Sequence, residues 1–65
     1  MDPDDSAVLY NVGCVYALLG ETDKSLECLQ KAVYSGYAHK EWIKHDSDLN
    51  SLREDPRFLK LLANL

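Results

Sequence analysis

The chain has 65 residues, a length that allows one small domain with a thin hydrophobic core. Eleven acidic and seven basic residues give a net charge of −4, and the basic residues are scattered, which argues against nucleic-acid binding because phosphate recognition needs clustered positive charge. No apolar stretch approaches the roughly 20 residues of a membrane span, so we expect no membrane partner.

The two cysteines, Cys14 and Cys28, fall on different predicted helices, and no basic-then-apolar signal peptide opens the chain. A small secreted domain held together by disulfides would carry more cysteines. We therefore expect free thiols and a cytoplasmic protein. The short length further suggests a piece of a longer protein.

The first helix is expected to run from Ser6 to Leu19. Asp4, Asp5 and Ser6 offer N-capping oxygens. Gly20 can adopt the left-handed conformation that ends many helices. None of the residues in this helix is charged and nearly all are apolar, a composition that predicts burial on several sides.

Three stripes run along this helix when residues are placed about 100° apart. The stripe expected to face the second helix consists of Leu9, Val12, Gly13 and Tyr16. The stripe suited to an adjacent unit consists of Val8, Val15 and Leu19. The third stripe consists of Ala7, Tyr10, Asn11, Cys14, Ala17 and Leu18. Gly13 costs about 1 kcal/mol relative to alanine in mid-helix, so we expect a close helix–helix approach there.

The second helix is expected to run from Asp23 to Ser35, with Thr22 as its N-cap and Gly36 as its end. One face is apolar and consists of Leu26, Leu29 and Val33, with Ser25, Cys28 and Ala32 beside them. The opposite face is polar and consists of Lys24, Glu27, Gln30 and Lys31. A turn of three residues joins the two helices, so they must pack antiparallel as a hairpin.

The remaining segment predicts three short helical pieces. The first spans Lys40 to Lys44, and a second follows the polar turn at residues 45–47 and carries Leu49 and Leu52. The last begins with Asp55 as its cap and Pro56 at its first position. Its apolar face consists of Phe58, Leu59, Leu61, Leu62 and Leu65. We expect Trp42 and Phe58 to seal this segment against the second helix; the alternative is that they form an exposed binding patch.

The first two helices resemble a tetratricopeptide repeat, a helix–turn–helix unit of about 34 residues. The resemblance is carried by the spacing of Leu9, Val12, Gly13, Tyr16, Gly20, Leu29 and Ala32. The departures are Leu9 for a frequent aromatic residue, Ser25 for the usual alanine, Leu29 for an aromatic residue and Tyr37 for a closing proline. The segment from Gly36 to Phe58 is similar to the C-terminal end of tetratricopeptide arrays in bacterial multidomain proteins.

The resemblance implies an all-α fold in a single domain, residues 1–65. Residues 1–5 would end a preceding repeat, residues 6–39 would form the repeat, and residues 40–65 would form a degenerate helical cap. The residues expected to be structural are Leu9, Val12, Gly13, Tyr16, Gly20, Leu26, Leu29, Ala32, Trp42 and Phe58.

The resemblance also implies a non-catalytic scaffold module that binds a protein or peptide segment. The third stripe would line the groove for this segment, with Asn11 at the position where many peptide-binding members hydrogen-bond the ligand backbone. Tyr10 would offer an aromatic platform. Two alternatives stay open: a structural cap that keeps a longer array soluble, and a homodimer formed through Val8, Val15 and Leu19.

The sequence contains little that points to chemistry. His39, Glu41 and His45 are the one metal-like group, but only Glu41 and His45 share a helix face, and structural zinc normally takes four ligands. Neither cysteine has a base nearby in sequence, and no phosphate-binding loop or nucleophile elbow occurs. We therefore expect no enzyme, no metal and no cofactor.

Overall fold

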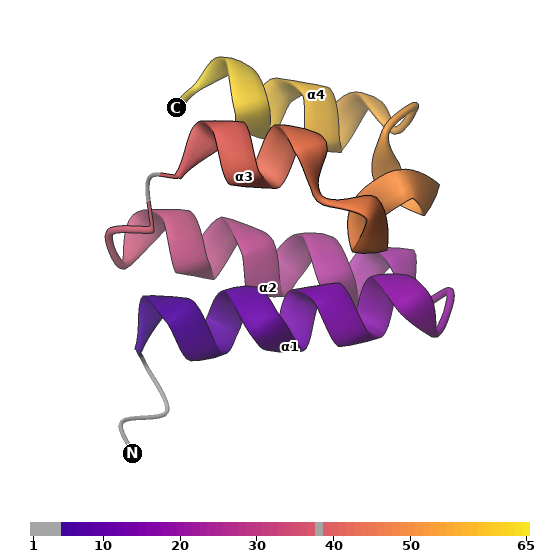
Figure 1. The fold of residues 1–65 in the computed structure, drawn as a ribbon, viewed down its shortest axis with the longest axis horizontal. Helices are drawn as coiled ribbons and strands as arrows, with labels where there is room; N and C mark the ends of the chain where they lie inside the picture. Colours follow the sequence, from indigo (N-terminus) through magenta and orange to yellow (C-terminus); the bar gives the residue numbers. More distant parts are fainter. Residues whose placement is uncertain (1–4, 38) are drawn as a thin grey trace.

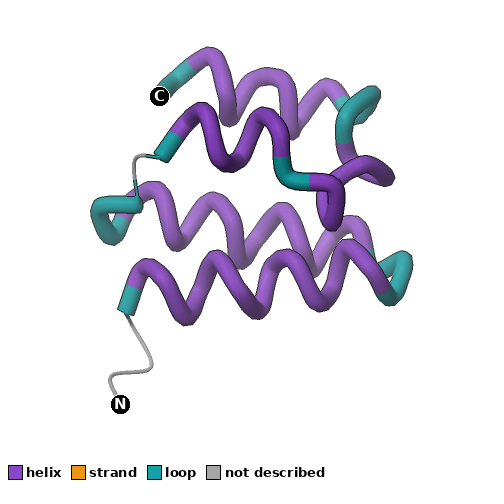
Figure 2. The backbone as a smooth tube through the Cα atoms, in the orientation of Figure 1, coloured by secondary structure: helices purple, strands orange, loops and turns teal. Residues whose placement is uncertain are grey.

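A computed structural model describes residues 5–37 and 39–65, so most of the segment expected to end a preceding repeat, residues 1–4, lies outside the described residues. The described part is all-α, as predicted, and Figure 2 shows helices joined by short turns. In chain order the elements are α1 (Ser6–Leu18), α2 (Thr22–Tyr34), α3 (Lys40–His45), the 3₁₀ helix η1 (Ser47–Leu52) and α4 (Pro56–Ala63). None of these helices combines the length and the hydrophobicity that crossing a membrane would need.

The ends of α1 and α4 follow the predicted capping residues. Asp5 caps α1 by accepting hydrogen bonds from the backbone N–H groups of Ala7 and Val8. Gly20 follows α1 with a φ of 80°, a left-handed conformation that glycine adopts without strain. Asp55 caps α4 by accepting from the Arg57 N–H.

The start of α2 differs from the prediction by one residue. Thr22 is the first helical residue and not the cap, and Glu21 holds the capping position without a side-chain hydrogen bond. The Glu21 N–H donates to the Tyr16 carbonyl at 2.9 Å and its carbonyl accepts from the Ser25 N–H. The backbone of Glu21 therefore hydrogen-bonds to the last turn of α1 and to the first turn of α2, so the connection between the two helices is short.

The two long helices approach closely at Gly13, as predicted. A Cβ atom at Gly13 would lie 2.9 Å from Leu29 Cδ2 and 3.3 Å from the Ser25 carbonyl oxygen. The Ser25 side chain is fully buried, and its hydroxyl donates a hydrogen bond of 2.7 Å to the Gly13 carbonyl. The missing side chain on one helix and the small hydroxyl on the other together allow this spacing.

The C-terminal half covers the hairpin. Figure 1 shows α1 and α2 running side by side, with α3, η1 and α4 stacked against them. The core is continuous across both halves and consists of Tyr10, Cys14, Ala17, Leu26, Leu29, Ala32, Tyr37, Ile43, Leu49, Leu52 and Phe58. Leu49 and Leu52 of η1 are completely buried, so this short element supplies core side chains that a regular repeat would take from a longer helix.

Trp42 and Phe58 do not share the sealing role that the sequence predicts. Phe58 is 1% exposed, which confirms that it packs in the core, whereas Trp42 is 66% exposed. The neighbouring Ile43 is buried in its place. Because α3 is six residues long and adjacent side chains point about 100° apart, the helix buries one of the two and turns the other outward.

We predict that Gly13→Leu lowers the free energy of unfolding by about 1–3 kcal/mol, because overpacking of the contact with Leu29 and the Ser25 backbone outweighs the gain of about 1 kcal/mol in helix propensity. Urea denaturation followed by circular dichroism measures this change. Asn11→Ala is the matched control, since Asn11 is exposed on the same helix and its substitution is expected to leave stability within about 0.5 kcal/mol. An undiminished stability of Gly13→Leu would contradict the close approach.

We predict opposite outcomes for the two large aromatic residues of the C-terminal half. Phe58→Ala should cost about 3–5 kcal/mol, enough to unfold most of a chain of this size. Trp42→Ala should cost less than about 1 kcal/mol because the side chain is largely exposed. Thermal unfolding of both variants tests this, and equal losses would show that Trp42 is part of the core.

Candidate functional site

The predicted groove on α1 is split into a buried and an exposed part. Tyr10, Cys14 and Ala17 are buried, so the prediction that they line an open groove is wrong. The reason is that η1 and the loop before it pack onto this face: Ser51 of η1 donates a hydrogen bond to the Ala17 carbonyl at 3.3 Å. The other members of the stripe remain exposed: Ala7, Asn11 and Leu18.

The first stripe is also split. Gly13 is buried against α2, while Leu9 and Tyr16 are half-buried. Val12, predicted to face α2, is 40% exposed. With Val15, Leu18 and Leu19 it forms the exposed apolar strip of α1, in which these last three residues are 54%, 66% and 69% exposed.

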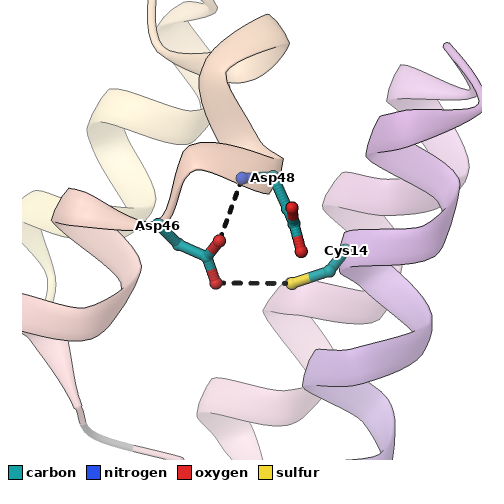
Figure 3. A group of neighbouring side chains, drawn as sticks. All are labelled: Cys14, Asp46 and Asp48. Atoms are coloured by element: carbon teal, nitrogen blue, oxygen red, sulfur yellow. Dashed lines mark hydrogen bonds between the residues drawn. The ribbon is translucent and has the colours of Figure 1, made fainter.

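Asp46 joins the C-terminal half to α1. Its carboxylate accepts hydrogen bonds from the Tyr10 hydroxyl at 2.5 Å and from the Asp48 N–H at 2.9 Å. The Cys14 thiol lies 3.8 Å from the same carboxylate and donates weakly to it (Figure 3). Because the Asp48 contact caps η1, one side chain fixes both the start of η1 and its position on α1.

Burial and negative charge keep the partners of Asp46 protonated. Burial, followed by the hydrogen bond to Asp46, raises the pKa of the Tyr10 phenol well above its usual value. Burial, together with the nearby charges of Asp46 and Asp48, raises the pKa of the Cys14 thiol from 9.0 to about 11. At neutral pH the thiol is therefore a weak hydrogen-bond donor and a poor nucleophile.

Figure 3 also shows that Cys14, Asp46 and Asp48 converge, and their ligand atoms lie within 4.8 Å of one another. A metal ion bound here would need the thiolate. The raised pKa of Cys14 and the hydrogen bonds to Asp46 favour a hydrogen-bonded junction over a metal centre.

The histidine-containing group that the sequence singled out is not brought together as a ligand set. Glu41 Oε2 and His45 Nε2 lie 3.5 Å apart on the exposed side of α3. His39 stacks on Trp42 instead, with ring centroids 4.8 Å apart.

A row of stacked aromatic rings leads from the core to the surface. Tyr10 stacks on Tyr37 at 4.4 Å between centroids and with nearly parallel planes. Tyr37 meets His39 edge-on at 4.9 Å, and His39 stacks on the exposed Trp42. From the sequence, Tyr37 stood out only because it occupies the position at which a proline usually closes a tetratricopeptide repeat. The clustering of aromatic residues between 37 and 42 was the available signal, but ring stacking depends on the fold.

A shallow hollow opens at the outer end of this row. It lies between α1 and α3, and Asp46, which directly follows α3, also borders it. Its lining consists of Tyr10, Glu41, Trp42, His45 and Asp46. Tyr10 is 6% exposed and contributes only an edge, whereas Trp42 supplies a large exposed surface. Asn11 follows Tyr10 on α1 and is exposed. We call this feature the α1–α3 hollow.

A second hollow lies between α2 and α4. Its lining consists of Asp23, Leu26, Glu27, Gln30, Arg57, Lys60, Leu61 and Asn64. Arg57 bridges this hollow with an ion pair of 2.8 Å to Asp23 and also pairs with Asp55 at 3.0 Å. Asp23 and Arg57 of this lining therefore balance each other, and Glu27 pairs with Lys31.

Comparison with known proteins gives one partial relative. The chain is 38% identical over 61 residues to a chloroplastic protein of Arabidopsis thaliana. The match covers 92% of this chain but 18% of the plant protein, so the chain spans less than a fifth of that relative's length. No family model matches the chain, and no solved structure matches it significantly. Because the relative is a plant protein, the similarity to bacterial arrays stays a prediction.

We predict that stability falls at alkaline pH through Cys14. The unfolded chain releases this thiol proton near pH 9, whereas the folded chain holds it to about pH 11, so the stabilisation is complete below pH 9 and is lost as the pH rises through 11. The loss should approach about 1.4 kcal/mol per pH unit from this group. Urea denaturation between these pH values measures it.

Cys14→Ala should flatten this pH dependence, although raised pKa values of Tyr10, Tyr37 and Cys28 leave part of it in place. Cys28→Ala is the control, because Cys28 is only half-buried and contributes less. An identical slope in the Cys14 variant and in the unsubstituted chain would contradict the assignment.

Proposed function

We propose that the chain is a non-catalytic protein–protein interaction module of the tetratricopeptide type, and that the α1–α3 hollow is its contact site. The exposed Trp42 beside this hollow carries the proposal. A tryptophan that is 66% exposed in so small a domain leaves a large apolar surface in water, and tryptophan is among the residues that contribute most to protein interfaces.

Three features support the repeat assignment. The hairpin α1–α2 has a short connection, Gly13 allows the close helix contact, and the short helical elements after α2 suit a degenerate cap of such a repeat. The site differs from the groove inferred from sequence. Trp42, Glu41 and His45 of α3 take the place of the buried Cys14 and Ala17.

The exposed apolar strip of α1 supports the alternative function. Of the stripe that the sequence assigns to an adjacent unit, Val15 and Leu19 are exposed and Val8 is half-buried, and the exposed Val12 adds to this surface. Such a surface would suit a purely structural cap of a longer array or a homodimer.

We predict that titration of the ¹⁵N-labelled chain with a pooled peptide library shifts the Trp42 indole signal and the amides of Glu41 and His45. Trp42→Ala, which should stay folded, should abolish most of these shifts. Shifts confined to Val8, Val15 and Leu19, with the neighbouring Val12, would instead identify a structural cap. Light scattering over a concentration series separates that outcome from a homodimer, because a constant monomer mass excludes self-association.

A further inference from the structure

The α1–α3 hollow combines an exposed aromatic face with negative charge. Glu41 and Asp46 supply two carboxylates, Trp42 supplies the indole, and His45 lies beside Glu41. No lysine or arginine is among the described residues that line it, although Lys40 and Lys44 lie elsewhere on α3. The chemistry of the lining is thus that of a site for a cation.

Neither carboxylate of the hollow is paired with a lysine or arginine side chain among the described residues, unlike three other carboxylates of the chain. Asp23 and Asp55 both pair with Arg57, and Glu27 pairs with Lys31 at 3.3 Å. By contrast, Glu41 has only His45 as an ion-pair partner, and that partner carries charge only when protonated. The negative charge of the hollow is therefore only weakly compensated within the described residues.

The carboxylate of Asp46 accepts hydrogen bonds from three groups of the described chain. Its donors are the Tyr10 hydroxyl, the Cys14 thiol and the Asp48 N–H, all of which are neutral groups. Arg53 comes near, but it donates to the backbone carbonyls of Lys44 and Asp46. Neutral donors orient a carboxylate without adding a balancing positive charge, so Asp46 adds a second carboxylate to the lining of the hollow.

Trp42 is held in place by its neighbour. His39 stacks on the indole with an angle of 21° between the ring planes, and His39 is itself braced edge-on by the buried Tyr37. This support reduces the conformational entropy that Trp42 would lose on binding. A braced indole with a largely exposed surface beside carboxylates suits a planar cation, which can stack on the ring and donate to an oxygen at the same time.

We propose that the α1–α3 hollow binds an arginine side chain of a partner protein, with the guanidinium stacked on Trp42 and hydrogen-bonded to Glu41. Arginine is favoured over lysine because its planar group both stacks and forms two parallel hydrogen bonds to a carboxylate. This inference rests on the proposed function, because it names the chemistry of the partner at that same site.

The test starts from peptides of the pooled library that shift the Trp42 indole signal. In each binder, arginine is replaced singly by citrulline, which has the same shape without the charge, and by lysine. The dissociation constant follows from the fluorescence of Trp42, the single tryptophan of the chain. We expect the citrulline peptide to bind about tenfold more weakly and the lysine peptide to lie between the two.

Two variants of the chain locate the effect. Glu41→Gln should weaken binding of the arginine peptide about tenfold and leave the citrulline peptide within about twofold. Glu54→Gln is the matched control, since Glu54 is exposed and is not among the lining residues, and it should change neither constant by more than about twofold. Both variants should unfold at the same temperature as the unsubstituted chain.

The outcomes separate the two proposals. If peptides shift the hollow but bind equally well with citrulline, the arginine inference is overturned and the interaction function stands. If binding depends on arginine but Glu54→Gln weakens it as much as Glu41→Gln does, the effect is one of net charge and the site is overturned. If no peptide shifts Trp42, Glu41 or His45, both proposals fail.

Discussion

The contact between Gly13 and Leu29 is the constraint on which the rest of the structure depends. It brings α1 and α2 together closely enough for the Ser25 hydroxyl to reach the Gly13 carbonyl, and a side chain at Gly13 would overlap Leu29. With this spacing set, Tyr10, Cys14 and Ala17 form a continuous surface on the other side of α1. That surface is what the C-terminal half covers.

The covering half depends on a small number of contacts because its elements are short. Leu49 and Leu52 bury completely, but a 3₁₀ helix of six residues has little stability of its own. Asp46 offsets this, because its carboxylate caps η1 and also accepts a hydrogen bond from the Tyr10 hydroxyl of α1. The same arrangement places the half-buried carboxylate of Asp46 in the lining of the α1–α3 hollow, so a structural junction also contributes to the chemistry of that hollow.

The outward position of Trp42 connects packing to the proposed function. Ile43 fills the core position on α3, and the stacked rings of Tyr37 and His39 then hold the indole at the surface. An exposed tryptophan costs solubility unless a partner covers it. The exposed apolar strip of α1 leaves a second apolar surface in water.

The sequence by itself determined the helices and two of their caps, because periodicity and capping are local: the Asp5 and Asp55 caps, the turn at Gly20 and the close approach at Gly13 were all predictable, whereas Thr22 proved to be the first residue of α2 and not its cap. It also identified Phe58 as a core residue. Only the tertiary structure decided which apolar residues are covered. Helix α1 is apolar nearly all round, so periodicity could not show that η1 would bury Tyr10, Cys14 and Ala17. The choice between Trp42 and Ile43, and the meeting of Asp46 with α1, depend on how a short helix is oriented against distant residues, which no local pattern specifies.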